Sequence, residues 1–476
     1  MDNTHTLPFF DFFHISDREM QKVLDLALSR GGDFSEIFCE YRIHSSILME
    51  EDIIKETGES IGMGIGIRVI SGDKTGYAYT NDLSPAKINS AAITAASIAN
   101  GKIRQKAVPL NFKTNTHNLY PIVQSGKEAL LEAKIDLAKK AYLTAQRFDA
   151  AIQKVRVSFA DLTRYITILN SEGLKVSDVQ PMIKLVCLAV AERGESREAG
   201  FSGGGGRVGL EYFTGTLTPE EIGREAAQEA VQLLDASPSP AGEMPVILSP
   251  GHSGVLIHEA VGHLIEADFL RKKTSIFWNK SGQKIARENV TIYDDPTIPY
   301  FRGSYNIDDE GTQPEKTLVI ENGKLVGFLQ DRLSSSLMKM SLTGHGRRQD
   351  FSCIPIPRMS NTYIAGGEYD REEIIRSVAK GFYADKFQGG QVEDSGKFTF
   401  SVSSGFLIED GRLTTPVKQA TLIGTNIDIL NKIEKIGSDL KFGLQTGTCG
   451  KGGQGAPVTD GCPTIKISQM TVGGIK

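Results

Sequence analysis

The sequence predicts an α+β protein, with an N-terminal α/β domain over residues 1–236 and a mainly antiparallel, β-rich C-terminal domain over residues 243–476. The chain has 476 residues, more than the roughly 100–200 of one ordinary domain. Its first half mixes helical and strand patterns, whereas its second half is Gly-rich with strand patterns at short intervals. Between them, SPSPAG at residues 237–242 is the clearest linker, so we place the main boundary there.

The first helix is predicted from its end signals. Ser16 followed by Glu19 has the pattern of a capping box and begins an apolar-periodic stretch, and Gly31 and Gly32 supply the stop.

An alternating segment follows at residues 61–69 and predicts a strand. Its Ile, Met and Val side chains share one face, and Gly62, Gly64 and Gly66 share the other. We expect the bare face to pack tightly against a helix or neighbouring strand. A docking surface for a partner or peptide is the alternative.

The rest of the N-terminal half contains further helical and strand patterns. An Ala/Leu/Lys/Glu-rich stretch at residues 126–148 predicts a helix, and residues 154–193 have strand patterns. The segment from Thr218, with Pro and Glu residues directly after it, predicts a capped helix that ends near Asp235. A further division into two subdomains would fall near residues 115–125.

The second half contributes strands such as residues 316–320 and 397–402, and a helix begun by Asp370 and Glu373.

The glycines Gly204, Gly206 and Gly209 match the letters of a dinucleotide fingerprint. They lack the strand before and the helix after that such a site needs, so we expect a flexible or tight turn there.

Composition narrows the class of protein. Lys plus Arg (53) and Asp plus Glu (58) leave a net charge of −5 with no long basic run, so no direct nucleic-acid ligand is expected. The N-terminus lacks the basic and apolar parts of a signal peptide, and no segment approaches the ~18 apolar residues that span a bilayer. We expect no membrane association and a cytoplasmic location.

The five cysteines are odd in number and widely scattered, which is not the pattern of a disulfide framework. At least one thiol is therefore available for chemistry. Cys39, Cys187 and Cys462 are expected to be buried as small hydrophobic residues.

A metal-binding pattern lies in the apolar helical stretch at residues 254–268, which contains His258, Glu259 and His263. Zincins usually space their two His ligands four apart, whereas here the spacing is five. Five steps at ~3.6 residues per turn leave the imidazoles roughly 140° apart on a regular helix. We therefore expect a π-bulge or a break at Val261-Gly262.

A catalytic zinc needs a third protein ligand and leaves one position open to water. Spacing does not choose among the candidates, although the glycines around Cys449 would let its thiolate approach a metal. The candidates are Glu266, His345, Cys353, Cys449, Cys462 and the acidic turn Asp308-Asp309-Glu310. For that turn, a solvated or hydrogen-bonded role is the simpler expectation.

The chemistry of such a site would be hydrolysis. Zinc would lower the pKa of its water to about 7 and polarise a carbonyl, and Glu259 would act as the general base. His345 and Arg348, in polar Gly-bounded sequence, could stabilise an oxyanion or grip a peptide backbone, with ordinary ion pairing as the alternative.

The sequence resembles the TldD/PmbA family, and specifically its TldD branch of zinc metalloproteases. The shared motifs are GIRVI…GYAYT at 66–80, HEAVGH at 258–263, DDEGT at 308–312, HGRRQ at 345–349, PRMSNTY at 357–363 and GTCGKGGQG at 447–455. Cys353 departs from the family pattern, which raises the question of an additional sulfur near the cleft.

The resemblance implies an N-terminal α/β region and a C-terminal β-rich metalloprotease domain. It selects Cys449 as the third zinc ligand beside His258 and His263, makes Glu259 the catalytic glutamate, and implies one zinc per active subunit. It also implies unfolded or extended peptides as substrates, and a homodimer or a heterodimer with a PmbA-like subunit.

Two rival functions remain open at this stage. One is a non-catalytic regulatory protein of the gyrase-modulator type with a structural metal, and the other is zinc-dependent hydrolysis of a non-peptide amide. A structural zinc has four protein ligands, whereas a catalytic zinc keeps one position open.

Overall fold

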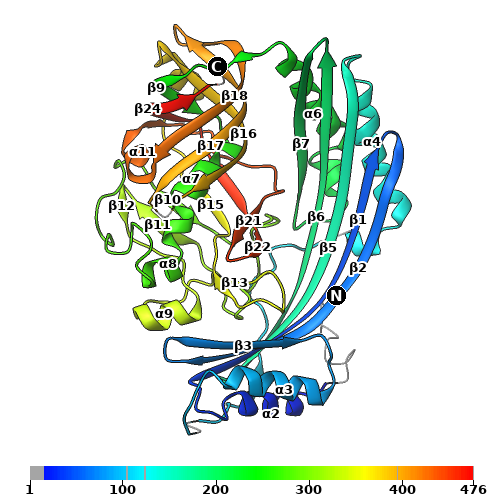
Figure 1. Ribbon diagram of the computed structural model, residues 1–476, viewed down its shortest axis with the longest axis vertical. Helices are drawn as coiled ribbons and strands as arrows, with labels where there is room; N and C mark the ends of the chain where they lie inside the picture. The colour runs from blue at the N-terminus through cyan, green and yellow to red at the C-terminus, as the bar shows by residue number, and fades with distance from the viewer. Residues whose placement is uncertain (1–14, 103–104, 123–124, 394, 475–476) are drawn as a thin grey trace.

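A computed structural model gives the fold and describes residues 15–102, 105–122, 125–393 and 395–474. A long, curved N-terminal sheet stands beside a C-terminal region built on two further sheets (Figure 1). The predicted mixture of helices with β-rich sheets is confirmed. The strand pairs are mostly antiparallel, and the parallel exceptions include β9 with β16 and β15 with β23.

The N-terminal sheet has seven strands in the order β3-β2-β1-β5-β6-β4, with β7 also paired to β6. These strands are β1 (Phe34–Glu50), β2 (Ile53–Ser71), β3 (Lys74–Thr80), β4 (Asn111–Phe112), β5 (Ile152–Asn170), β6 (Leu174–Arg193) and β7 (Ser196–Gly206). Because β1, β2, β5 and β6 run for 17 to 20 residues each, one sheet supports two separate helical layers.

Those two layers bury different parts of the sheet. Helices α2 (Asp17–Ala27) and α3 (Pro85–Ala96) share a hydrophobic cluster with β1 and β2. Helices α4 (Leu131–Gln146) and α6 (Pro219–Leu234) share another with β5 and β6, joined by the short α5 (Tyr212–Gly215). The 3₁₀ turn η1 (Gly126–Glu128) precedes α4.

The predicted capping boxes are confirmed at α2 and α6. Ser16 and Glu19 exchange side-chain and backbone hydrogen bonds at the start of α2, and Thr218 and Glu221 do the same at α6. Asp235 is the C-cap of α6, as expected. Each signal spans four residues and needs no tertiary contact, so the sequence alone is enough to predict it.

The C-terminal region contains a seven-stranded sheet, a six-stranded sheet and two small hairpins. The first sheet has the order β19-β24-β9-β16-β17-β18-β8, with β8 (Ser237–Pro238), β9 (Gly242–Leu248), β16 (Lys380–Val392), β17 (Lys397–Glu409), β18 (Arg412–Thr425), β19 (Ile433–Ile436) and β24 (Ile465–Gly473). The second has the order β12-β11-β10-β15-β23-β20, with β10 (Ile292–Asp294), β11 (Thr317–Glu321), β12 (Lys324–Leu325), β15 (Asn361–Ile364), β20 (Lys441–Phe442) and β23 (Thr459–Cys462). The hairpins are β13 (Gly346–Arg347) with β14 (Ile356–Pro357), and β21 (Thr448–Lys451) with β22 (Gln454–Pro457).

Short helices connect and cover the strands of these sheets. They are η2 (His252–Gly254), α7 (Val255–Ala260), η3 (Gly262–Ile265), α8 (Ala267–Arg271), α9 (Arg332–Met338), α10 (Arg371–Arg376) and α11 (Asn426–Lys432). Asp370 caps α10, as the sequence predicts. Within the described ranges, no helix combines the length and the apolar composition needed to cross a membrane.

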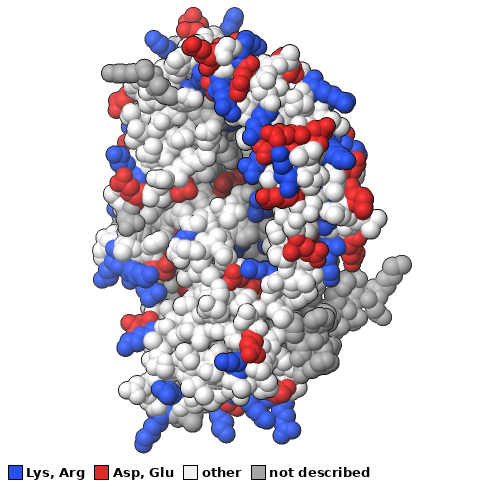
Figure 2. All heavy atoms as spheres, turned by 45° about the vertical axis from the view of Figure 1, so that its right-hand side comes forward, with Lys and Arg blue, Asp and Glu red and all other residues white. Residues whose placement is uncertain are grey.

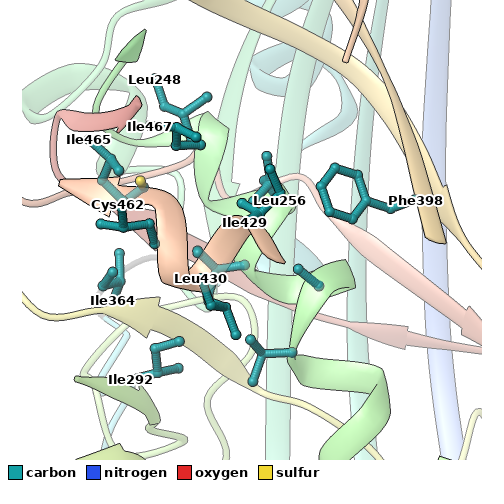
Figure 3. Close-up of a cluster of buried hydrophobic side chains, with 14 of the residues drawn as sticks. Leu248, Leu256, Ile292, Ile364, Phe398, Ile429, Leu430, Cys462, Ile465 and Ile467 are labelled. Carbon is teal, nitrogen blue, oxygen red and sulfur yellow. The ribbon is translucent and has the colours of Figure 1, made fainter. Parts of the chain in front are cut away.

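Helix α7 is held inside the largest hydrophobic cluster. Figure 3 shows Leu256 of this helix among side chains from β9, β24, α11 and β17, with Ile292 and Ile364 of the second sheet nearby. Leu256, Ile257 and Ala260 are at most 1% exposed. This burial fixes the helix that carries His258.

The glycine face of the predicted strand packs tightly, as expected, and one of its contacts comes from the far half of the chain. A Cβ on Gly64 would overlap the Phe351 ring, and one on Gly66 would overlap the Tyr77 hydroxyl, which donates a hydrogen bond to the Phe351 carbonyl at 2.6 Å. The bare face therefore packs against Tyr77 of the neighbouring strand β3, as expected, and also accepts a C-terminal loop at Phe351.

The turn expected at Gly204 and Gly206 is wrong. Residues 203–206 end strand β7 and pair with residues 183–186 of β6. A Cβ on Gly205 would overlap the carbonyl of Ile183, so the glycines allow close backbone approach within the sheet.

The segment at residues 237–242 connects α6 to β9, and its strand β8 pairs in parallel with β18. A main boundary at this segment stays a prediction. So does the division near residues 115–125, of which residues 123 and 124 lie outside the described ranges.

Candidate metal centre

The helix that carries His258 breaks where the five-residue spacing requires it. Helix α7 ends at Ala260, Val261 has φ −125° and ψ −50°, and the 3₁₀ turn η3 begins at Gly262. Of the two distortions expected here, the structure shows the break. The change of direction brings the imidazole of His263 back beside that of His258, with ring centroids 5.2 Å apart.

Three donor atoms converge at this break. The Sγ of Cys449 lies 3.2 Å from Nε2 of His258 and 3.3 Å from Nε2 of His263. With Zn–N near 2.1 Å and Zn–S near 2.3 Å, tetrahedral ligand atoms would lie about 3.5 Å apart. The two observed sulfur–nitrogen distances are slightly shorter than this value and close to the spacing that zinc requires.

Each imidazole is oriented by a carboxylate on its other nitrogen. The Nδ1 of His258 lies 2.8 Å from Asp460, and the Nδ1 of His263 lies 3.0 Å from Glu266. A proton on Nδ1, shared with the carboxylate, leaves the Nε2 lone pair free to bind a metal. Both Nε2 atoms face Cys449, so the donor set fits a metal such as zinc.

The electrostatics of the three donors are strongly coupled. Although burial raises it, the neighbouring His258 and His263 lower the pKa of Cys449 to about 5. Burial lowers the pKa of His263, but Glu266 and Cys449 outweigh it and raise that pKa to about 9. The lowered pKa of Cys449 favours its thiolate, the form that binds metals.

Glu259 stands beside the donors without joining them. Its Oε2 lies 3.8 Å from Nε2 of His263, and its side chain is 17% exposed. Burial, opposed by His258 and His263, raises the pKa of Glu259 above its ordinary value. A carboxylate with a raised pKa beside a metal site is suited to accept a proton from water.

Cys449 is held in place by the β21–β22 hairpin and its surroundings. Cys449 pairs with Ala456, and Gly452 and Gly453 at the tip have φ of +58° and +75°. The guanidinium of Arg358 donates to the Cys449 carbonyl at 2.6 Å. The ammonium of Lys451 pairs with Glu266 at 3.0 Å, which ties the hairpin to the carboxylate that orients His263.

Among the described residues, one group of three or more His, Cys, Asp and Glu side chains has its donor atoms close enough together to hold a metal ion, and it consists of His258, His263 and Cys449. Of the other candidates for a third ligand, Glu266 orients His263 instead, and Cys462 is fully buried in the hydrophobic core. Cys353 also lies outside this group. Cys39 and Cys187 lie in hydrophobic clusters, as expected.

The acidic turn is a hydrogen-bonded element rather than a metal site. Asp308 accepts backbone hydrogen bonds from Glu310, Thr312 and Gly346. Asp309 pairs with Arg164 at 2.9 Å, and Glu310 pairs with Arg68 at 2.6 Å.

His345 and Arg348 form ion pairs and hydrogen bonds away from the three donors. His345 is fully buried between Thr343 and Asp294, at 2.9 Å from each. Arg348 is 3% exposed and pairs with Glu36. Both residues thus make the ordinary ion pairs and hydrogen bonds of the alternative, and a contact of either residue with a substrate stays a prediction.

Sequence reasoning missed Asp460 and gave no role to Lys451 or Arg358. Asp460 is 202 positions from His258, so no local spacing connects them. Lys451 and Arg358 did lie inside the quoted motifs GTCGKGGQG and PRMSNTY, where a charged residue among glycines or small residues was the available signal.

The centre lies on the side of the C-terminal region that faces the N-terminal sheet, where the β21–β22 hairpin projects (Figure 1). Figure 2 shows the surface hollowed between these two parts of the molecule. The partial exposure of Glu259 and His263, at 17% and 14% of their side chains, shows that the centre reaches the surface.

Three family models match successive parts of the chain. They are PmbA/TldA metallopeptidase domain 1 over residues 35–99, the central domain over residues 126–234 and the C-terminal domain over residues 241–474.

Similar proteins cover nearly the whole chain. A metalloprotease TldD homolog from Haemophilus influenzae is 38% identical over 467 residues, which is 97% of each chain. A zinc metalloprotease TldD homolog from Saccharolobus solfataricus is 27% identical and covers 96% of this chain and 100% of its own.

Solved structures share the fold. A putative modulator of a DNA gyrase from Thermotoga maritima has a TM-score of 0.78 at 23% identity, with 96% of this chain and 100% of its own covered. TldE from Thermococcus kodakarensis has a TM-score of 0.73 at 22% identity and the same coverage. The family models and the full-length relatives together show that this chain belongs to the PmbA/TldD family of metallopeptidases.

Proposed function

We propose that the chain is a zinc-dependent peptidase that cleaves unfolded or extended peptides, with His258, His263 and Cys449 as metal ligands and Glu259 as general base. The convergence of both Nε2 atoms on the Cys449 sulfur carries this proposal. Two nitrogens and one thiolate make a three-ligand set, the number that catalytic zinc sites use when one position stays open.

A bound zinc would act as a Lewis acid that acidifies water and polarises the scissile carbonyl. Glu259 would take the proton of the attacking water on a carboxylate oxygen and deliver it to the leaving amine. Asp460 and Glu266 would keep both imidazoles oriented while this proton moves.

The number of ligands favours catalysis over the regulatory alternative. A purely structural zinc would be closed by four protein ligands. Within the described part of the chain, the donor group has three members, and Glu259 lies next to it with a raised pKa. The full-length relatives carry metalloprotease names, which favours peptides over other amides as substrates.

We place the protein in the cytoplasm, with one zinc per active subunit and as a homodimer or a heterodimer with a PmbA-like subunit. The fold shared with TldE, at a TM-score of 0.73, supports a related chain as a partner.

The general-base role is tested with Glu259→Gln, which removes the charge and keeps the shape. We expect the variant to bind one zinc per chain and to cleave an unstructured peptide about 10²–10⁴-fold more slowly, the usual contribution of a general base. Zinc content by elemental analysis and peptide cleavage are measured on the same samples.

Glu372→Gln is the matched control, since Glu372 pairs only with exposed Arg371. It should cleave at the wild-type rate. Equal rates for Glu259→Gln and wild type, both with zinc bound, would refute the assignment. If the zinc-loaded wild type cleaves neither a peptide nor the denatured protein from which the peptide is taken, the regulatory alternative is favoured.

A further inference from the structure

Three buried arginines lie between the two halves of the molecule without a carboxylate in ion-pair contact. Arg207, Arg302 and Arg347 are 3%, 6% and 4% exposed. Within the described residues, no Asp or Glu oxygen lies within 4.0 Å of their guanidinium groups. Buried charges are normally paired, because removing an ion from water is costly.

Their hydrogen bonds go to neutral groups. Arg302 donates to the carbonyl of Gly447 at 2.7 Å and to the thioether of Met182, a weak acceptor. Arg347 donates to the carbonyls of Met359 and Pro457. These bonds satisfy N–H groups, but none of them pairs a guanidinium group with a carboxylate.

Arg207 is the least satisfied of the three. Its guanidinium lies over the Tyr120 ring at 5.3 Å, and its buried Nε has no hydrogen-bond partner among the described residues. The carboxylate that acts on it electrostatically is Asp178, whose oxygens already accept bonds from Tyr120, Asn306 and Gln180.

The three charges also repel one another. Burial, with Arg207 and Arg347 as cationic neighbours, lowers the pKa of Arg302 to about 10. Lys184 adds a fourth cation, and burial with Arg302 nearby lowers its pKa as well. The group therefore carries an excess of positive charge.

A cavity of about 60 Å³ lies against this group. Arg207 and Arg347 line it, together with neutral polar side chains such as Gln180, Tyr305 and Gln349. The other two arginines in its wall have carboxylate partners, since Arg164 pairs with Asp309 and Arg348 pairs with Glu36, which lies outside the lining. Asp308 also lines the cavity, and burial beside Glu310 raises its pKa well above the ordinary value, which favours its neutral form.

We propose that this cavity binds a small oxyanion, a carboxylate or inorganic phosphate, with Arg207 and Arg347 as its principal contacts. Guanidinium groups bind such anions with two parallel, charge-assisted hydrogen bonds, and the unpartnered Nε of Arg207 provides one donor. The site goes beyond the proposed peptidase activity. Its anion comes either from solution or from the C-terminal carboxylate of a peptide.

The site is also connected to the hairpin that carries Cys449. Arg302 donates hydrogen bonds to the Gly447 carbonyl and the Thr448 hydroxyl. Arg347 donates one to the carbonyl of Pro457, the residue that pairs with Thr448 in the hairpin. An anion that neutralises the arginines would therefore stabilise the base of this hairpin.

Thermal unfolding of the full chain tests the proposal without relying on catalysis. Melting temperatures are measured in inorganic phosphate, acetate and chloride at equal ionic strength, for wild type, Arg207→Met and the control Arg197→Met. Arg197 lies on the same strand-to-loop segment but is 65% exposed and pairs with Glu192. We expect phosphate or acetate to raise the melting temperature of wild type and control by about 2 °C or more over chloride at saturating concentration.

Arg207→Met should lose this anion-dependent rise and should not melt below wild type in chloride, because it removes an uncompensated buried charge. If Arg207→Met does not fold, Arg207→Lys replaces it, and we expect a reduced rise because the planar fork is lost. Two results overturn the proposal. One is an anion-dependent rise in melting temperature that is as large in the Arg207 variant as in wild type. The other is no rise in the melting temperature of wild type with phosphate, acetate or a peptide that has a free C-terminal carboxylate.

A second arm identifies the source of the anion. Equal concentrations of one peptide with a free C-terminal carboxylate and with a C-terminal amide are compared in the same melting experiment. An Arg207-dependent rise with the acid form alone assigns the site to a peptide terminus. A rise with phosphate or acetate and equal effects of the two peptides assigns it to an anion from solution.

Discussion

At the scale of single residues, two carboxylates determine which nitrogen of each imidazole is available to a metal. Asp460 reaches His258 from β23, and Glu266 reaches His263 from the turn that follows it. Although burial raises it, Lys451 and His263 lower the pKa of Glu266 to about 2, so this carboxylate is charged throughout the neutral range. Both carboxylates thus orient the donors toward a common point, which raises metal affinity.

The role of Asp460 is tested by Asp460→Ala. We expect the fold to be retained and the zinc affinity to fall about 10–100-fold, the usual effect of losing an orienting carboxylate. Competition with a chelator of known affinity gives the dissociation constants. Asp428→Ala, which breaks only a half-exposed pair with Lys432, should bind zinc as wild type does. An unchanged affinity in Asp460→Ala would show that the orienting bond is dispensable.

The sequence predicts part of this centre because part of it is local. His258, Glu259 and His263 lie within six residues, and their chemistry shows in their spacing. The choice of Cys449 depended on a family resemblance, since contacts across 186 residues leave no local periodicity. Asp460 went unnoticed for the same reason: a single Asp in a short strand has no distinctive neighbour.

At the scale of elements, the break between α7 and η3 converts a five-residue spacing into a chelating pair. Gly262 allows this because Met359 packs directly against its Cα. Met359 is fully buried, so it has little room to move.

Gly262→Ala tests the break. Its Cβ would overlap the Sδ of Met359, and we expect a loss of about 1–3 kcal/mol in the free energy of unfolding, together with weaker zinc binding as His263 shifts. Denaturant unfolding of the metal-free protein and chelator competition measure the two effects. Gly215→Ala is the matched control, because a Cβ there meets nothing within 4 Å. If both variants behave alike, the tight packing at Gly262 does not hold the break.

Sequence patterns that act within a few residues predicted helix ends correctly, whereas structure that depends on distant contacts could not be predicted from them. The capping boxes at Ser16 and Thr218 satisfy backbone groups within four residues, so the sequence is sufficient to place them. Gly204 and Gly206 were expected to form a turn, since glycine runs favour turns. Their actual role, close pairing against β6, depends on a neighbouring strand.

At the scale of the whole molecule, buried ion pairs join the N-terminal sheet to the C-terminal region. Glu36 of β1 pairs with Arg68 of β2 and with Arg348 from the other half. Arg68 in turn reaches Glu310, and Arg164 reaches Asp309. Although burial raises it, Arg68 and Arg348 hold the pKa of Glu36 below its ordinary value.

Glu36→Gln tests this connection. We expect the free energy of unfolding to fall by about 3–5 kcal/mol, because two buried guanidinium groups lose the carboxylate charge that they share. A lowered pKa means that Glu36 contributes stability above its unfolded pKa of about 4.5 and loses that contribution as the pH falls. The difference between variant and wild type in denaturant unfolding should therefore shrink on acidification.

Glu192→Gln provides the comparison, since Glu192 pairs with Arg197 at the surface and should change stability by less than about 1 kcal/mol. A loss in Glu36→Gln no larger than in this variant would mean that the buried network does not couple the two halves.

The central claim is that one metal is held by His258, His263 and Cys449, and metal stoichiometry tests it most directly. Wild type, Cys449→Ser and the control Cys353→Ser are loaded with zinc, dialysed against a weak chelator and measured by elemental analysis. We expect one zinc per chain in wild type and Cys353→Ser, and almost none in Cys449→Ser, which lacks the thiolate. One firmly bound zinc in Cys449→Ser would contradict the proposed ligand set.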